Sequence, residues 1–287
     1  MAGRKPRPSP RPDGRARAMG AGKIAGAGAR DWDPDAYSRF RDLRLRPALD
    51  LIARIPSLPE RGKIIDLGCG NGAVAEALNH RYPKRKLVGV DNSEPMLQRA
   101  AATGAYHRCD LADIAEWTPN KPPAMIFSNA ALHWLPDHAE LFPRLAGSLR
   151  EGGVLAVQMP AQQSAPSHRI LRDLAQEMFP DRFDFTGWVP PVASPVDYAK
   201  LLSPFGALDI WSTEYLQELA PALGAHPVRR FTESTAMRPF LKQLGDTEAQ
   251  VLIERYESAL EKVYPARADG SVLFPFRRLF IVLSLGG

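Results

Sequence analysis

Short apolar runs alternate with amphipathic stretches through the middle of the chain. The apolar runs predict five strands, within KIIDLGCG (63–70), KLVGVDNS (86–93), AYHRCDL (105–111), PAMIFSNAALHW (123–134) and VLAVQMP (154–160). The stretches between them have apolar residues at helical spacing, as in AVAEALNHRY (73–82), EPMLQRAAATG (94–104) and HAELFPRLAGSLREGG (138–153). Strands that alternate with helices in this way predict a doubly wound parallel sheet with helices on both faces.

The alternation loosens after Pro160. Residues 208–219 alternate like a strand, and the apolar run 271–285 is too short to span a bilayer and predicts a final strand. A helical block lies between them, over residues 225–264. We therefore expect an α/β fold of seven strands, in which a helical cap of about residues 220–268 is inserted between the last two strands.

The net charge is concentrated at the N-terminus. The formal charge is +5, but residues 1–30 carry eight basic residues and one acid, which leaves −2 for the remaining 257 residues. The folded part is therefore slightly acidic, and we expect no nucleic-acid surface. The tail of residues 1–30 is rich in Pro, Gly, Ala and Arg and is predicted to be disordered. Its composition fits a solvated extension, a weak transit peptide or a basic arm for acidic partners.

Cysteine content and hydropathy restrict the class of protein. Cys69 and Cys109 are the only cysteines in the sequence, and neither lies in a zinc-like pair with His or Cys. We expect no metal site, no membrane span and a cytoplasmic protein. The sequence does not indicate an oligomeric state.

The stretch IIDLGCGNG (64–72) is the first candidate binding element. A strand that turns sharply into a helix exposes unpaired backbone N–H groups, and glycines let a ligand approach that backbone closely. A nicotinamide cofactor is one possible ligand, because Gly68-x-Gly70-x-x-Ala73 fits the dinucleotide pattern and Asp91 follows about twenty residues later. The pattern alone does not decide the ligand.

Four further features favour another cofactor. Asp66 and Gly72 extend the pattern to D-x-G-x-G-x-G, Asp91 and Asp110 end the second and third strands, Asn129 follows the fourth, and EGGVLAV opens the fifth. With these features the chain resembles the class I S-adenosylmethionine-dependent methyltransferases, which have a Rossmann-like fold. The resemblance implies that residues 31–287 form the methyltransferase domain and that S-adenosyl-L-methionine is the cofactor. The cofactor-binding residues it implies are Asp66, Gly68, Cys69, Gly70, Asp91, Asn92, Met96, Asp110, Leu111 and Asn129.

A narrower resemblance covers nearly the whole chain from Asp31 to Leu285. The segments DWDPDAYSRFRDLRLRP, SNAALHWLPDHAELFPRL, GGVLAVQMP, AMRPFL and FPFRRLFIVL are similar to the trans-aconitate 2-methyltransferase family. That resemblance implies a carboxyl O-methyltransferase that forms a monomethyl ester of a small polycarboxylic acid and S-adenosyl-L-homocysteine. An ionised carboxylate is already a nucleophile at neutral pH, so we expect no general base.

The acceptor would be held by arginines, because a guanidinium binds carboxylates in bidentate pairs. Arg238 and Arg278 are the leading candidates, followed by Arg277 and Arg44. His133 and Trp134 are the candidate catalytic residues, since they follow the fourth strand, where the methyl group is expected. Trp32, Tyr37 and Phe40 could close over the cofactor as a lid.

The sequence departs from the family pattern on the acceptor side. Residues 161–168 read AQQSAPSH, with Ala165 where the family has Glu. The alternatives are therefore another small acid, a malonyl group on an acyl carrier protein with Arg229 and Arg230 as contacts, or a non-catalytic binder of S-adenosylmethionine.

Overall fold

A seven-stranded sheet organises the molecule. The computed structural model describes the backbone of residues 41–286 and the side chains of residues 45–286. The strands are β1 (Ile64–Leu67), β2 (Leu87–Asp91), β3 (Arg108–Leu111), β4 (Met125–Asn129), β5 (Val154–Pro160), β6 (Gly206–Leu219) and β7 (Val272–Leu285). Their order is β3-β2-β1-β4-β5-β7-β6; the first five are parallel, and β7 is antiparallel to both neighbours. The predicted fold class is confirmed.

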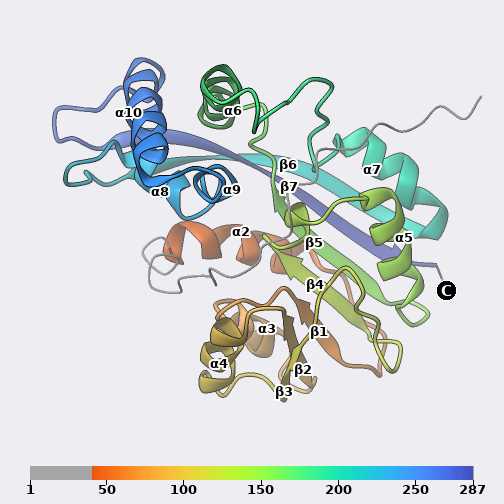
Figure 1. Ribbon diagram of the computed structural model, residues 1–287. Helices are drawn as coiled ribbons and strands as arrows, with labels where there is room; N and C mark the ends of the chain where they lie inside the picture. The colour runs from red at the N-terminus through yellow and green to blue at the C-terminus, as the bar shows by residue number, and fades with distance from the viewer. Residues whose placement is uncertain (1–40, 287) are drawn as a thin grey trace, which may run out of the picture.

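Helices cover both faces of this sheet (Figure 1). The α-helices of the described residues are α2 (Arg41–Arg54), α3 (Ala75–Arg81), α4 (Glu94–Ala102), α5 (His138–Gly147), α6 (Pro166–Met178), α7 (Pro195–Leu202), α8 (Pro227–Glu233), α9 (Arg238–Leu241) and α10 (Asp246–Val263). Two apolar clusters lie on opposite faces of the sheet. One contains Leu51 of α2 and Leu78 of α3, and the other contains Phe142 of α5 and Tyr198 of α7. The central strands β1, β2, β4 and β5 are therefore buried on both sides, as their continuous apolar runs predict.

Strands β6 and β7 form an antiparallel pair, here called the hairpin, whose strands are longer than the other strands of the sheet. Arg278 pairs with Pro160, the last residue of β5, so residues 272–277 continue past the carboxyl ends of the parallel strands. Figure 1 shows this hairpin crossing the view, with α8, α9 and α10 at one end beside α6. These helices bury a third apolar cluster with the hairpin, which includes Phe231, Tyr256 and Phe274. The predicted helical insertion between the last two strands is thus present.

Local sequence signals set the ends of α4. Ser93 precedes the helix, and its hydroxyl accepts a hydrogen bond from the backbone N–H of Met96 at 3.4 Å. Pro95 lies in the first turn, and Gly104 follows the helix with φ +68°, a left-handed conformation that glycine adopts without strain. The predicted N-cap and helix end are confirmed.

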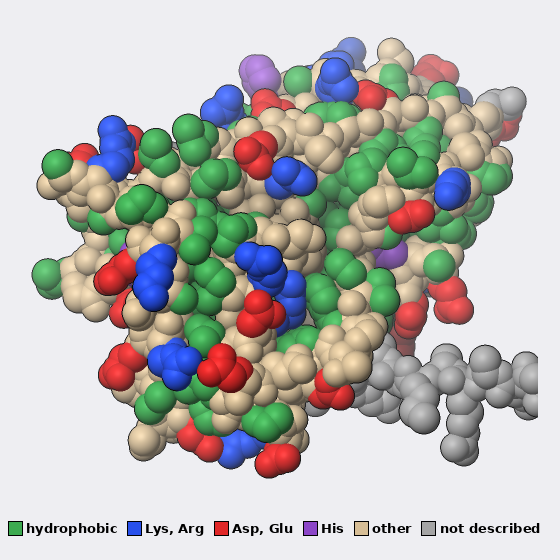
Figure 2. Space-filling model, turned by 90° about the horizontal axis from the view of Figure 1, so that it is seen from above, with side chains coloured by type: hydrophobic (Ala, Val, Ile, Leu, Met, Phe, Trp, Pro, Cys, Tyr) green, Lys and Arg blue, Asp and Glu red, His purple; other side chains and the backbone are tan. Residues whose placement is uncertain are grey.

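The basic tail of residues 1–30 and the predicted lid residues Trp32, Tyr37 and Phe40 lie outside the described residues, as does the side chain of Arg44. No helix within residues 41–286 is both long and apolar enough to cross a bilayer. On the face shown in Figure 2, basic and acidic side chains are interspersed among hydrophobic ones.

Candidate active site

The carboxyl ends of β1 and β4 lie at the point where the strand order reverses, between β2 and β5. In open parallel sheets, ligands bind in the crevice at this point. Asp66 and Asn129 project from β1 and β4 on the face of α2 and α3, because Ile64 and Phe127, two residues earlier on each strand, belong to the apolar cluster of that face. The crevice therefore receives polar side chains from two adjacent strands.

Asp66 is buried and shares a hydrogen bond with a tyrosine. The Tyr106 hydroxyl donates to Asp66 Oδ2 at 2.6 Å. Burial raises the pKa of Asp66 to about 7; the Tyr106 bond opposes this shift, and the charge of Asp91 adds to it. The phenol ring of Tyr106 reaches Asp66 by lying across β2 at Gly89, where a Cβ would be 3.0 Å from Tyr106 Cε1. Gly89 thus makes room for the side chain that holds Asp66.

The glycine turn after β1 has two different sides. Gly68 and Gly70 have φ of +77° and +53°, in the left-handed region. A Cβ on Gly68 would lie 2.2 Å from the Cβ of Ala131, whereas a Cβ on Gly70 would meet nothing within 4 Å. Gly68 is therefore required by packing, and Gly70 leaves its side of the turn open for a ligand.

Asp91 ties the turn to the second strand. Its carboxylate accepts hydrogen bonds from the backbone N–H groups of Gly70 at 2.8 Å and Ser93 at 3.0 Å. Cys69 precedes Gly70 in the turn and is buried. Burial, together with the carboxylates of Asp66 and Asp91, raises the pKa of its thiol. A protonated thiol is not a nucleophile, so Cys69 acts as a small packed residue of the turn.

The remaining predicted cofactor residues lie around β2 and β3. Leu111 ends β3 beside Asp91 and is 61% exposed, which presents an apolar surface at the edge of the crevice. Asp110 forms an ion pair with Arg108 at 2.9 Å. Asn92 is exposed, and Met96 is buried in the first turn of α4.

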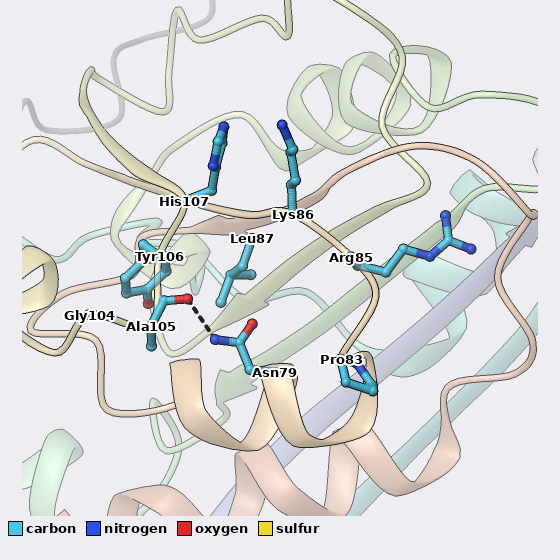
Figure 3. Close-up of a pocket in the computed structure, with 9 residues that line it drawn as sticks. All are labelled: Asn79, Pro83, Arg85, Lys86, Leu87, Gly104, Ala105, Tyr106 and His107. Atoms are coloured by element: carbon cyan, nitrogen blue, oxygen red, sulfur yellow. Dashed lines mark hydrogen bonds between the residues drawn. The ribbon is translucent and has the colours of Figure 1, made fainter.

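A separate pocket of about 480 Å³ lies at the opposite, amino ends of β2 and β3 (Figure 3). Its lining includes Lys86, His107 and the backbone before β3, where Asn79 Nδ2 donates to the Ala105 carbonyl oxygen at 2.6 Å. Figure 3 shows Lys86 and His107 projecting in the same direction and Arg85 projecting away from them. Arg85 donates to the carbonyl oxygens of Gly62 and Pro59, so its guanidinium supports the chain before β1.

A row of buried polar side chains continues from Asn129 across β5 and β7. Gln158 pairs with Asn129 in the sheet register, and the guanidinium of Arg278 donates to Gln158 Oε1 at 3.4 Å. Arg278 is only 3% exposed and lies over the ring of Phe276, with Cζ 4.3 Å from the centroid. Within the described residues, Asn129 Oδ1 and Gln158 Nε2 are buried without a hydrogen-bond partner. Buried polar atoms are rarely unpaired, which marks this row as a candidate binding surface.

Two neutral histidines lie close to this row. Burial lowers the pKa of His133 to about 3, with a further contribution from the charges of Arg278 and His168. Burial lowers the pKa of His168 to about 4, and its Nδ1 is 3.1 Å from the Ser167 hydroxyl. The ring of Trp134 lies 4.7 Å from that of His133, in the short helix Leu132–Trp134 that follows β4. Both imidazoles are therefore uncharged at neutral pH and suited to hydrogen bonding rather than to charge pairing.

The other predicted arginines are not all brought to this row. Arg277 projects to the opposite face of β7, where its exposed side chain pairs with Glu214 at 3.5 Å. Arg238 begins α9 and is half-buried. Arg229 pairs with Glu257 at 2.9 Å, and Arg230 pairs with Glu233 at 2.7 Å. The charges of Arg229 and Arg230 are thus matched by neighbouring acids.

Comparison with known proteins identifies the family. Residues 37–219 match the family model described as a methyltransferase domain. A trans-aconitate 2-methyltransferase of Methylobacterium nodulans is 44% identical over 256 residues, which cover 88% of this chain and 97% of the relative. The trans-aconitate 2-methyltransferase of Variovorax paradoxus is 40% identical over 265 residues, with the same coverage of 88% and 97%. The chain belongs to the trans-aconitate 2-methyltransferase family.

Solved structures agree with this methyltransferase in fold. The YcgJ protein from Bacillus subtilis superposes with a TM-score of 0.53 at 15% identity, covering 84% of this chain and 99% of YcgJ. Phosphoethanolamine N-methyltransferase 2 of Haemonchus contortus, in complex with S-adenosyl-L-methionine, has a TM-score of 0.51 at 16% identity, covering 88% and 56% of the two chains. At these identities the likeness concerns the fold alone.

The structure brings to the candidate site three residues that the sequence patterns did not single out, namely Tyr106, Gln158 and His168. Gly89, in the middle of an apolar strand, was a signal for a close approach such as that of Tyr106. Gln158 is the one polar residue in the apolar run VLAVQMP, and that interruption was a signal as well. His168 offered no signal, because its proximity to His133 depends on how α6 returns to the sheet.

Proposed function

We propose that this methyltransferase transfers the methyl group of S-adenosylmethionine to one carboxylate of trans-aconitate or of a closely similar polycarboxylic acid. The products would be S-adenosylhomocysteine and a monomethyl ester. The observation that carries the proposal is the buried Arg278 guanidinium at the end of the polar row that runs from Asn129 of β4 through Gln158 of β5. The name of the relatives, trans-aconitate 2-methyltransferase, at about 40% identity over most of the chain, supports the same acceptor.

The crevice fits the cofactor on this structure's own features. Gly70 leaves open space beside the turn, Asn129 Oδ1 is a buried acceptor without a partner among the described residues, and Asp66 and Asp91 provide carboxylates. Asp66 and Asn129 would hold the amino-acid end, Asp91 the ribose, and Leu111 the base. When bound, the cofactor supplies an electrophilic methyl group on a positively charged sulfur.

The acceptor side can perform the reaction without a general base. A carboxylate is ionised at neutral pH and attacks directly, so the protein has to orient it and exclude water. Arg278 would hold a second carboxylate, since a buried guanidinium binds carboxylates strongly. Neutral His133 would hydrogen-bond the acceptor without repelling the positively charged sulfur.

The sheet geometry suits a small acid. β7 lies two strands from β4, and neighbouring strands are about 4.8 Å apart, which places the two roughly 10 Å apart. A small molecule can span that distance between side chains of the two strands. The paired state of Arg229 and Arg230 gives no support to a carrier protein as the acceptor.

A panel of acids tests the proposal. The purified protein is incubated with labelled S-adenosylmethionine and mono-, di- and tricarboxylic acids, and the products are identified by mass. We expect monomethyl esters of trans-aconitate and, more slowly, of other polycarboxylic acids, with no product from monocarboxylic acids. Binding of S-adenosylhomocysteine without transfer to any acid would favour a non-catalytic binder, and transfer only to a malonyl carrier protein would overturn the assignment of the acceptor.

A further inference from the structure

Gln158 occupies an unusual position at the end of β5. It is 0% exposed and is the one polar side chain between Val154 and Met159, all of which are buried. An apolar side chain there would pack against the face of α2 and α3, to which Ala156 of the same strand contributes. A buried amide whose donor has no partner costs free energy, so its presence calls for an explanation.

Within the described residues, only one half of the Gln158 amide has a hydrogen-bond partner. Oε1 accepts from the Arg278 guanidinium at 3.4 Å, whereas Nε2 has no partner within the described residues. Gln158, Arg278 and Asn129 project from adjacent strands on one face: Gln158 pairs with Asn129 on one side, and Arg278 pairs with Pro160, two residues beyond Gln158. The amide oxygen of Gln158 therefore orients the Arg278 guanidinium. The amide N–H groups remain available to a ligand placed beside Gln158 and Arg278.

We propose that Gln158 is a second acceptor-binding residue, whose amide and the Arg278 guanidinium together hold one carboxylate of the acceptor and select it over a neutral group. This inference rests on the proposed function. A carboxylate only accepts hydrogen bonds, so both of its oxygens match N–H donors from Gln158 and Arg278. A carboxamide would turn its own NH₂ group toward these donors, and that mismatch selects against it.

A second buried glutamine provides a matched control. Gln162 lies just beyond β5 and is also buried, but both halves of its amide are used: Nε2 donates to the Pro275 carbonyl oxygen at 2.9 Å, and Oε1 accepts from the Arg277 N–H at 3.0 Å. Replacing Gln162 removes hydrogen bonds within the fold. Replacing Gln158 by an apolar side chain of similar length removes the acceptor of Arg278 and a donor that no described residue uses.

The experiment compares the best polycarboxylic acid of the wild-type panel with its monoamides, in each of which one non-methylated carboxylate is replaced by a carboxamide. The acid-to-amide ratio is taken for the monoamide that the wild-type enzyme methylates most slowly. Gln158→Met should lower kcat/KM for the acid by roughly 10-fold and the acid-to-amide ratio by a similar factor, through loss of a hydrogen bond to a charged group. Gln158→Glu places a carboxylate on Arg278 and should lower kcat/KM for the acid by about 100-fold or more. S-adenosylhomocysteine affinity, measured by calorimetry, should stay within about twofold in both variants, because neither substitution removes a side chain assigned to the cofactor.

Gln162→Met should lower the melting temperature and leave the acid-to-amide ratio unchanged. An active wild-type enzyme whose ratio is the same in Gln158→Met, with cofactor affinity retained, would overturn the role of Gln158 and leave the proposed function standing. A wild-type enzyme that methylates no polycarboxylic acid would overturn the proposed function itself, and the role of Gln158 with it.

Discussion

The buried carboxyl of Asp66 has a pKa near neutral pH. Burial raises this pKa to about 7, so the carboxyl is about half protonated at neutral pH. In the proposed site, the ammonium group of the cofactor's amino-acid end would favour the ionised form of Asp66, so below pH 7 binding would have to release the proton. We predict that, as the pH is raised towards 7, S-adenosylhomocysteine affinity increases by up to about 10-fold per pH unit. Above pH 7 the affinity should be constant.

Calorimetry between pH 5.5 and 8 measures this dependence. The variant Asp66→Asn cannot ionise, and its affinity should be weaker at pH 8 and nearly independent of pH. An equally steep pH dependence in Asp66→Asn would assign the titration to another group.

Arg278 and Arg277 are adjacent in sequence and opposite in environment. Arg278 is buried against Phe276 and Gln158, and Arg277 is exposed and paired with Glu214. We predict that Arg278→Ala raises the acceptor KM by roughly 10- to 100-fold through loss of charged hydrogen bonds. Arg277→Ala should change it by less than about twofold, since exposed ion pairs contribute little.

Steady-state kinetics with varied acid measures both variants, and S-adenosylhomocysteine affinity should be unchanged in each. A loss of cofactor affinity in Arg278→Ala would place this guanidinium on the cofactor side of the crevice. Equal effects of the two substitutions would show that burial does not distinguish their roles.

At the scale of elements, two glycines of the turn after β1 differ in their surroundings. A Cβ on Gly68 would overlap Ala131 at 2.2 Å, whereas a Cβ on Gly70 meets no protein atom within 4 Å. We predict that Gly68→Ala lowers the free energy of unfolding by about 3 kcal/mol or more, since overpacking adds to the backbone strain. Gly70→Ala should cost only the strain of a left-handed conformation, about 1 kcal/mol.

Cofactor binding should show the opposite order of effects. The Gly70→Ala methyl group projects into the open side of the turn, so this variant should stay folded and lose S-adenosylhomocysteine affinity by 10-fold or more, roughly the effect of a small steric clash. Denaturant unfolding and calorimetry measure the two quantities. Full affinity in Gly70→Ala would mean that the cofactor does not approach this side of the turn.

The sequence predicts the helices and strands well, and the contacts between side chains that are distant in the sequence less well. Apolar runs and the Ser93 cap predict the strands and α4, because these signals are local. The row of Asn129, Gln158 and Arg278 depends on the register of three strands that are far apart in the chain. Alternation along β7 implies that only one of Arg277 and Arg278 points inward, but only the pairing of Arg278 with Pro160 shows which one. The hydrogen bond between Tyr106 and Asp66 likewise depends on strand pairing, because Tyr106 precedes β3 and β3 pairs with β2.

At the scale of the whole molecule, the helices on the hairpin are connected to the acceptor side through the start of α6. Tyr256 of α10 donates to the Ser167 carbonyl oxygen at 2.9 Å, and the Ser167 N–H donates to the Tyr264 hydroxyl at 3.3 Å. Ser167 in turn contacts His168 Nδ1. Since the charge of His168 acts on His133, we infer that the cap helices position one wall of the proposed acceptor site.

A pair of tyrosine substitutions tests this connection. Tyr256→Phe leaves the Ser167 carbonyl oxygen without its partner and should lower the free energy of unfolding by about 1–2 kcal/mol. Tyr198→Phe makes the same chemical change on the opposite side of the sheet, where the hydroxyl contacts His138 Nδ1 and the Ala193 N–H. Both tyrosines are fully buried, so the two variants should lose similar stability.

Only Tyr256→Phe should raise the acceptor KM, by roughly 2- to 30-fold, because only this hydroxyl fixes the start of α6. Thermal unfolding measures the loss of stability, and kinetics with varied acid measure KM, while S-adenosylhomocysteine affinity should be unchanged in both variants. If the two variants lose equal stability and both keep the wild-type KM, the cap helices support the fold without positioning the acceptor. If Tyr198→Phe raises KM as much as Tyr256→Phe does, the effect follows from general loosening of the protein rather than from the contact with Ser167.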